Sequence, residues 1–400
     1  MEVVLTQHPV GQGGMTSGLL EIPGGRFHWV YDCGSNHTEA LNREIAIVSA
    51  RGEIGCLFLS HLDSDYVNGV DRLLMAAPVK EVVLPYLNDL DRLIAAAHDD
   101  AAGALSGAFL TFLGDIDGWF AARGVERVTY ITPRDDDDGD EGGGPEFPTS
   151  DGGGEGEIQA KWWSRVEVSG SSFDRGATGK SGPAVQRLDL MASLHLRAAT
   201  GMIDWLLLPY AHRPADAKLY AFKRAMFRRF GPKYRSRLKS MLNDPQTRAK
   251  VKECYDLIYS DHNLVSMALY AGPSNSGSWG GECLHPPGWW RDGSGRAVGW
   301  LGTGDMHLNG VRRREAMIHH YRSVLDQVNV FALPHHGSHH NFHPSLPATM
   351  PNMTQCVAAA GPNGYGHPST GVRQAVQSSG REFLQVSDKG QSVLQWRHRR

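Results

Sequence analysis

Short apolar runs, interrupted by glycines, alternate with amphipathic stretches through the first 86 residues of the chain. Residues 27–31 and 55–59 have the length and composition of buried strands, whereas residues 40–50 and 67–76 place apolar side chains at helical spacing. Additional short strands are expected at residues 2–6, 18–22 and 79–84. Strands that alternate with helices in this way predict an α/β layered fold.

The same alternation returns toward the C-terminal end of the chain. Strands are expected at residues 264–270, 298–301, 328–333, 356–360 and 392–396, and helices at residues 312–324 and 371–379. Upstream of most of them, the apolar runs 188–196 and 202–208 flank a turn at Ala199-Thr200-Gly201, which predicts a β-hairpin. Residues 274–298 are rich in Gly, Ser and Trp and indicate a loop.

Three stretches interrupt the strand–helix pattern. Residues 87–133 have mainly helical spacing. Residues 134–185 contain an acidic, glycine-rich run that cannot bury enough apolar surface to become ordered, so a disordered loop is expected there. Residues 213–259 indicate a basic helical insertion. We therefore expect a single domain over residues 1–400 that carries these three insertions.

The formal charge of −3 is the sum of two opposed blocks. Residues 135–157 contain ten Asp or Glu and no Lys or Arg, whereas residues 213–252 contain thirteen Lys or Arg and two Asp. The near-neutral total excludes a uniformly basic nucleic-acid coat protein. A local basic block still favours a phosphate-bearing substrate, to which binding should weaken as salt rises.

Cations and aromatic residues are interleaved in this basic block. Three cations are expected to contact the substrate: Lys223, Arg224 and Arg228. The interspersed aromatic residues, which can stack on bases, are Tyr220, Phe222, Phe227, Phe230 and Tyr234. The alternative is an ordinary amphipathic helix, in which the aromatic residues form the apolar face and the cations form the solvated one.

The sequence predicts a cytoplasmic protein without membrane contact. No apolar run approaches the roughly 18 residues that a membrane-spanning helix needs. The start of the chain lacks the charged and apolar regions of a secretory signal. Five widely spaced cysteines, with no C-x-x-C, indicate reduced thiols and not a disulfide framework.

The first cluster of residues that could bind a metal ion or act in catalysis follows directly on the strand at residues 55–59. His61, Asp63 and Asp65 alternate along the chain, so three ligand-capable side chains can converge from one tight loop. Imidazole nitrogen together with carboxylate oxygen suits zinc, manganese or a similar divalent ion. The alternative is a polar turn in which Ser64 or Asp65 caps the next helix.

Two further clusters also stand at strand ends. Thr303-Gly304-Asp305 forms a glycine turn with one carboxylate, which could bridge two metal ions. His335-His336-Gly337-Ser338 ends a buried strand, and because adjacent side chains point in different directions, at most one of the two histidines is an easy ligand. The other would contact substrate or the metal's surroundings. A turn at residues 363–368 contains Asn363 and His367, although a His-Pro pair is also ordinary helix punctuation.

Together, and in this order, the clusters resemble those of the metallo-β-lactamase superfamily, most closely the soluble hydrolase domain of ComEC-type DNA-uptake proteins. The matching motifs are Val10-Gly11-Gln12-Gly13, Asp32-Cys33-Gly34, the metal loop from His61 to Gly69, Asn263 with Ser266, Thr303-Gly304-Asp305, His335 to Ser338 and Asn363 to Pro368. The resemblance implies a four-layer αββα sandwich with helical and disordered insertions. It differs at Tyr66, which stands where the family has a second metal-loop histidine.

The resemblance also implies a role for each site residue. His61, Asp63 and His335 would hold a first metal ion, and Asp65 and Asp305 a second one. Asp32 would orient the metal loop by hydrogen bonding. His336, Ser338 and His367 would contact phosphate or protonate the leaving group, and Tyr66 and Asn363 would contact the substrate.

The sequence therefore predicts a metal-dependent hydrolase of phosphodiester bonds, a nuclease that uses metal-activated water on DNA or RNA. One or two divalent ions are expected, zinc or manganese first and magnesium as a further option. One alternative is a hydrolase of a small molecule such as a cyclic nucleotide, thioester or lactam. Another is a binding or regulatory protein whose catalysis is weakened because Tyr66 replaces a histidine.

Overall fold

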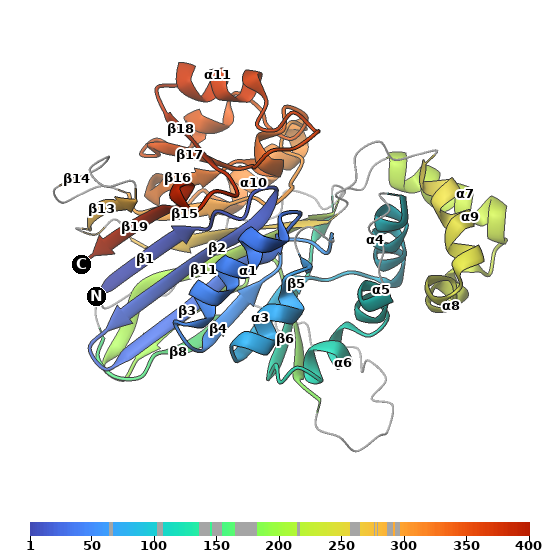
Figure 1. The fold of residues 1–400 in the computed structure, drawn as a ribbon, viewed down its shortest axis with the longest axis horizontal. Coiled ribbons are helices and arrows are strands. Elements are labelled where there is room, and N and C mark those ends of the chain that lie inside the picture. Colours follow the sequence, from blue (N-terminus) through green and yellow to red (C-terminus); the bar gives the residue numbers. More distant parts are fainter. Residues whose placement is uncertain are drawn as a thin grey trace.

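The computed structural model describes residues 1–63, 67–101, 107–135, 145, 154–164, 182–213, 217–256, 265–275, 277, 279–285, 291–292 and 297–400. In these residues the strands form two large mixed sheets, and helices lie on the sheets and to one side of them (Figure 1). The fold is thus α/β, as the sequence predicts.

The first sheet has the strand order β14-β13-β19-β1-β2-β3-β4-β5-β6-β9. Strands β3, β4, β5, β6 and β9 run parallel to one another, and the remaining pairs are antiparallel. The bounds are β1 (Glu2–Gln7), β2 (Gly13–Ile22), β3 (Gly25–Ser35), β4 (Ile54–Phe58), β5 (Val79–Pro85), β6 (Arg127–Ile131), β9 (Ala184–Leu188), β13 (Gly280–His285), β14 (Arg291–Asp292) and β19 (Leu394–Arg399).

The second sheet has the order β18-β17-β16-β15-β12-β11-β10-β8, with β7 paired to β11. Strands β15 to β18 are parallel, whereas β8, β10, β11, β12 and β15 are joined by antiparallel pairs. The bounds are β7 (Arg134–Asp135), β8 (Gln159–Trp163), β10 (Ser193–Ala198), β11 (Gly201–Arg213), β12 (Ser266–Gly272), β15 (Gly299–Gly302), β16 (Val328–Ala332), β17 (Gln355–Ala359) and β18 (Glu382–Val386).

Large aromatic side chains fill the space between the sheets. The indole of Trp300, from the second sheet, lies 5.8 Å from the ring of Trp29 and 5.3 Å from that of Tyr31, both from the first sheet. The Tyr31 hydroxyl also donates to the carbonyl of Met267 across the interface (2.7 Å). Burying aromatic side chains of 150–250 Å² each is a strong hydrophobic contribution, so this layer fixes how the two sheets face each other.

Helices cover the opposite faces of the two sheets. Their bounds are α1 (Thr38–Ser49), α3 (Val70–Ala76), α4 (Asp89–Ala101), α5 (Gly107–Gly114), α6 (Ile116–Ala121), α7 (Ala217–Phe230), α8 (Leu238–Asn243), α9 (Pro245–Asp256), α10 (Val311–Tyr321) and α11 (Thr370–Ser378). Apolar residues of α1 and α3 share a core with the first sheet, and those of α10 and α11 share another with the second. Helices α4, α5, α7, α8 and α9, called the helix group below, lie together at one side (Figure 1). None of the helices in the described ranges combines the length and apolarity needed to cross a membrane.

The expected hairpin is confirmed, since β10 and β11 pair from Ala198 and Gly201 onward. The insertions differ from expectation in two places. Residues 87–133 end in strand β6, because the β-branched and aromatic residues after Arg127 favour a strand over a helix. The range 134–185, expected as a disordered loop, contributes β7, β8 and the start of β9; in β8 the alternate residues Ala160 and Trp162 pack on the core between the sheets. Residues 136–144, 146–153 and 165–181 lie outside the described residues.

Three strands arise where the pattern indicated none. Residues 274–298 contain β13 and β14, which extend the first sheet beside β19. Residues 382–386 form β18 at the edge of the second sheet. These short strands lie at or next to the edges of the two sheets; their apolar signal is weak, so pairing with a neighbouring strand decides their conformation.

A buried histidine predicts how stability depends on pH. Burial lowers the pKa of His398, on β19, to about 3, from about 6.5 for an exposed histidine. The unfolded chain therefore binds the proton more tightly, so stability is full above pH ~6.5 and is lost as the pH falls toward 3. We expect the free energy of unfolding of His398→Leu to fall less steeply than that of the wild type over this range, by up to ~1.4 kcal/mol per pH unit. Urea unfolding at a series of pH values measures this, with the exposed His285→Leu as control; parallel curves for His398→Leu and wild type would contradict it.

Candidate metal site

Four strands place expected site residues at one edge of the two facing sheets. β3 is parallel to β4 in the first sheet, and β15 is parallel to β16 in the second. Parallel strands bring their carboxyl ends to the same edge. The residues at or just beyond these ends are Asp32, His61, Asp305 and His335. The edges of the two sheets are joined here, because the amide of Met267 donates to the carbonyl of Ser60 (2.7 Å).

The side chains at this edge gather around the carboxylate of Asp305. Its Oδ2 lies 3.7 Å from Nε2 of His61 and 3.6 Å from Nε2 of His335. Oδ2 of Asp63 lies 3.8 Å from the same His61 nitrogen. These separations exceed hydrogen-bond length and approach about 3.4 Å, the spacing of two ligands bound tetrahedrally to one zinc ion at roughly 2.1 Å. Among the described residues, no three His, Cys, Asp or Glu side chains form a complete metal-binding group. The side chains of the cluster are therefore close together, but they do not all point at one common position.

The tautomer of His61 follows from its neighbours. The hydroxyl of Ser60 donates to Oδ2 of Asp32 (2.8 Å), and the amide of Ser60 donates to Oδ1 (2.7 Å). Since a serine hydroxyl has one hydrogen, its contact with Nδ1 of His61 (2.8 Å) must be an accepted hydrogen bond. Nδ1 therefore carries the hydrogen, and Nε2 turns a lone pair toward Asp305 and Asp63.

His335 is fixed in the same way. Nδ2 of Asn341 donates to the carbonyl of Asp305 (2.9 Å), which orients the amide so that Oδ1 faces Nδ1 of His335 (3.1 Å). Because an amide oxygen only accepts, Nδ1 of His335 is the donor. Its Nε2 also turns a lone pair toward Oδ2 of Asp305.

In the neutral imidazoles, the Nε2 lone pairs of His61 and of the partly exposed His335 thus face Oδ2 of Asp305. The side chains of His61 and Asp305 are 3% and 5% exposed. At this separation their mutual repulsion is poorly screened, and a cation placed among them relieves it. The residues that can hold one are His61, Asp63, Asp305 and His335, and imidazole with carboxylate is the donor set of zinc or manganese sites.

The backbone around this cluster has a conformation that L-residues rarely adopt. Among the described non-glycine residues, positive φ occurs at Asp32 (58°), His335 (46°) and His336 (56°). Each left-handed residue costs roughly 1–2 kcal/mol. Gly304 also has a positive φ of 50°, and a Cβ there would come within 2.8 Å of the side chains of Ser60 and Ser266. Strain concentrated at one edge of the sheets is typical of a functional site.

His336 and Ser338 are less accessible than the sequence suggested. Nδ1 of His336 donates to the carbonyl of Ala359 (2.7 Å), and burial lowers the pKa of His336 to about 4. Ser338 is buried, its amide donates to the carbonyl of His335 (2.9 Å), and its hydroxyl accepts from the amide of His340 (3.3 Å). Both residues help to hold the turn that presents His335.

His367 lies beside the cluster, with its ring 5.2 Å from that of His335, and burial lowers the pKa of His367 to about 4. Asn363 organises this turn. Its Nδ2 donates to the carbonyls of Gly361 (2.8 Å) and His367 (2.7 Å), and its Oδ1 accepts from the amides of Tyr365 (3.0 Å) and His367 (3.2 Å). Both ends of the Asn363 amide are used within the turn, which favours a positioning role over the expected substrate contact.

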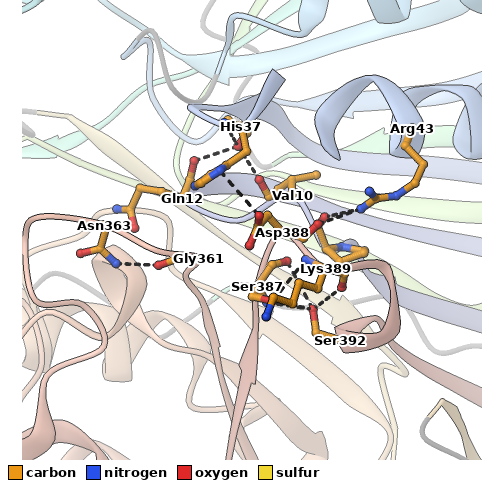
Figure 2. Close-up of polar contacts among 12 residues, drawn as sticks. Val10, Gln12, His37, Arg43, Gly361, Asn363, Ser387, Asp388, Lys389 and Ser392 are labelled. Atoms are coloured by element: carbon orange, nitrogen blue, oxygen red, sulfur yellow. Dashed lines mark hydrogen bonds and ion pairs between the residues drawn. The ribbon is translucent and has the colours of Figure 1, made fainter. Parts of the chain in front are cut away.

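The glycine-rich motif at residues 10–13 holds neighbouring segments together. The carbonyl of Gln12 accepts from the amide of Asn36 (2.9 Å), just before α1. Figure 2 shows this turn close to Asp388, whose carbonyl accepts from Nη2 of Arg43 (3.1 Å). A Cβ on Gly361 would come within 3.1 Å of the Gly11 backbone. Glycine at position 361 therefore allows the turn that carries His367 to lie against the motif at residues 10–13.

Some expected residues lie elsewhere. Asp65 and Tyr66 are outside the described residues. Lys223, Arg224 and Arg228 are on α7, in the helix group, and not among the strand ends. Sequence reasoning missed Ser60 and Asn341, which set the tautomers of the two histidines; their positions next to His61 and inside the histidine-rich run 339–343 were the available signals.

No protein-family model matches the chain, and no curated protein is significantly similar to it in sequence. The membership suggested by the motifs therefore stays a prediction.

The Asp32–Ser60 contact can be tested through stability. Asp32→Ala should lower the free energy of unfolding by about 1–3 kcal/mol, because the buried amide of Ser60 loses its acceptor. Asp32→Asn keeps an acceptor oxygen, and asparagine tolerates positive φ better than alanine, so its loss should be smaller. Urea unfolding of both variants measures the difference. Equal losses would show that the hydrogen bonds from Ser60 contribute little.

Proposed function

We propose that this chain is a metal-dependent hydrolase of phosphodiester bonds, a nuclease that acts on DNA or RNA. The observation that carries the proposal is the convergence of two Nε2 lone pairs on the buried carboxylate of Asp305. We also propose the four-layer αββα sandwich of the metallo-β-lactamase superfamily as its architecture. Two facing sheets, each sharing an apolar core with helices on its other face, support that assignment.

The first metal ion would be held by His61, Asp63 and His335, with Asp305 beside it. Zinc or manganese suits these donors best, and magnesium is a weaker match because it prefers oxygen ligands. A second ion would need Asp65 in addition to Asp305. When bound, a divalent ion supplies positive charge that acidifies water and neutralises the oxygens of a phosphodiester.

Asp32 and Ser60 keep His61 ready to bind. Burial raises the pKa of Asp32 well above its usual range, and the two hydrogen bonds from Ser60 oppose that rise. A cation held by His61 would favour the charged carboxylate further. This hydrogen-bonded chain keeps the hydrogen on Nδ1, so that Nε2 stays available as a ligand.

Two groups lie where a phosphodiester would meet the cluster. His367 is next to His335. The exposed ring of Tyr365 is stacked on the ring of His367, with 6.1 Å between the ring centroids. We assign His367 to contact with the scissile phosphate or its leaving oxygen. The basic residues 213–252 favour a polyanionic substrate over a small neutral one such as a lactam.

The metal and the activity are tested together. Protein reconstituted with zinc or manganese and then dialysed should retain about one ion or more per chain and cleave some member of a panel of DNA, RNA and cyclic nucleotides. His61→Ala/His335→Ala should lose the ion and at least about 100-fold of the cleavage rate, because losing ligands exceeds the 10–100-fold effect of residues that only orient them. Elemental analysis and gel assays measure both quantities.

The exposed His285→Ala is the matched control and should behave as the wild type does. Wild-type protein that folds but retains no metal would eliminate the enzymatic proposal. Cleavage that persists in the double variant would show that the activity arises elsewhere. Hydrolysis of cyclic nucleotides alone would replace the nuclease with a small-molecule phosphodiesterase.

Asn341 should affect the metal without being a ligand. Asn341→Ala removes the acceptor of His335 Nδ1 and the donor to the Asp305 carbonyl, so metal affinity should fall about 10–100-fold. Competition with a chelator of known affinity measures this. Asn352→Ala, at a residue that donates to the carbonyl of Asp326 away from the cluster, is the control. Equal affinities for the Asn341 variant and the wild type would remove Asn341 from the site.

A further inference from the structure

The helix group extends the apolar core that α1 and α3 share with the first sheet, and part of the aromatic set in α7 is buried in it. Phe222 and Met226 are fully buried and belong to one apolar cluster with Leu93 of α4 and Phe109 of α5. Tyr234, in the turn after α7, belongs to the same cluster and is 2% exposed. These residues hold the helices together, so they are not available to a ligand.

The opposite face of α7 presents two aromatic side chains to solvent. Tyr220 is 70% exposed and Phe227 is 53% exposed. Residues 220, 224, 227 and 228 recur at i, i+4, i+7 and i+8, which places them on one face of the helix. Seven residues at 1.5 Å each separate the two rings by about 10 Å along the axis.

This face is also positively charged. Arg224 and Arg228 are exposed, and among the described residues no acidic side chain lies within ion-pair distance of either. Arg229, turned toward α9, differs because Glu253 neutralises it at 3.0 Å. Further exposed cations of the helix group are Lys233, Arg237 and Lys250. Tyr220 and Phe227 thus alternate with two arginines that have no acidic partner among the described residues. Such a face suits a ligand that carries both negative charge and aromatic rings.

The helix group is connected to the candidate metal site. Its helices α7, α8 and α9 are inserted between β11 and β12, and the last residues of β11 pair with the first of β12, His212 with Ser266. The hydroxyl of Ser266 accepts from the amide of Asp305 (3.2 Å). Helix α4 follows β5, the parallel neighbour of β4, which leads to His61. Strands β11 and β5 therefore end at the edge of the sheets where the ligands gather.

We infer that this face of α7 binds single-stranded nucleic acid, with Tyr220 and Phe227 stacking on unpaired bases. Arg224 and Arg228 contact the phosphates between them. The inference rests on the proposed nuclease function and specifies its substrate class.

Single strands fit this face better than duplexes. In a duplex the faces of the bases are covered by their neighbours, whereas an unpaired base leaves its π-face open to an aromatic side chain. The separation of about 10 Å between the rings equals about three nucleotides at 3.4 Å each. Two rings and two guanidinium groups can therefore engage consecutive nucleotides of one strand.

Fluorescence anisotropy of the full-length protein tests the inference, with EDTA present so that no strand is cut. The probes are a labelled single-stranded DNA of about 20 nucleotides, the matching duplex and an abasic strand of the same length. Tyr220→Ala and Phe227→Ala should each weaken single-strand binding roughly 5- to 100-fold. Binding of the duplex and of the abasic strand should change little. Tyr220→Phe and Phe227→Tyr should restore single-strand binding.

The arginines should act differently from the rings. Arg224→Gln and Arg228→Gln should weaken binding of all three probes and lower the slope of log affinity against log salt by about 0.7 per lost single-strand phosphate contact. Arg229→Gln, at the neutralised position, should change little. Trp163→Ala, at another exposed aromatic residue, is the control for loss of a ring.

Three outcomes would overturn the inference: unchanged single-strand affinity in both aromatic variants, equal weakening on the abasic strand, or tight binding to anionic lipid vesicles that the same variants abolish. Hydrolysis of bis(4-nitrophenyl) phosphate by the metal-reconstituted protein separates this test from the proposed function, since the α7 variants should retain it. Wild type that binds single strands through these rings but hydrolyses no phosphodiester would support the inference and contradict the nuclease.

Discussion

The mutual repulsion of lone pairs around Asp305 is the constraint on which the rest of the site depends. Oδ2 of the buried Asp305 lies 3.7 Å from Nε2 of the buried His61 and 3.6 Å from Nε2 of His335, whose side chain is 30% exposed. Each imidazole is prevented from turning its N–H inward, because Asp32 through Ser60, and Asn341, take up the hydrogens on Nδ1. A divalent cation bound among these atoms would relieve their repulsion.

Holding this arrangement costs conformational energy, and the aromatic layer between the sheets offsets it. The left-handed residues persist because Asp32 lies within β3, and His335 and His336 follow β16, and the side chains of both strands are largely buried. The site lies where the sheets touch, at the hydrogen bond from Met267 to Ser60. Any shift of one sheet on the other would therefore separate His61, from the first sheet, from Asp305, from the second.

The sequence predicted what is local and missed what is contributed by distant segments. His61, Asp305 and His335 could be found because each directly follows an apolar run, and carboxyl ends of parallel strands share an edge. The role of Ser60 in fixing the tautomer of His61 was missed because it depends on Asp32, 28 residues earlier, and the hydrogen bond from Asn341 to Asp305 joins residues 36 apart. Helical spacing divides the aromatics of α7 into two faces, yet which face is covered depends on α4 and α5. Edge strands such as β18 acquire their conformation from pairing, so a short pattern did not reveal them.

The basic block of the sequence can be related to the position of the carboxylates at the strand ends. Under the proposed function, a phosphodiester that approaches the strand ends would meet Asp63 and Asp305, whose negative charges repel it as long as no divalent ion is bound. The ligands that make the chemistry possible therefore oppose binding of the substrate they would act on. Cations cannot be placed among them without competing for the metal's position, so attraction has to come from a neighbouring element. In our proposal α7, α8 and α9, which are inserted between β11 and β12 in the stretch that carries the excess of Lys and Arg, supply this attraction. Such a separation of attraction from chemistry would explain why a chain of nearly neutral total charge carries so basic an insertion.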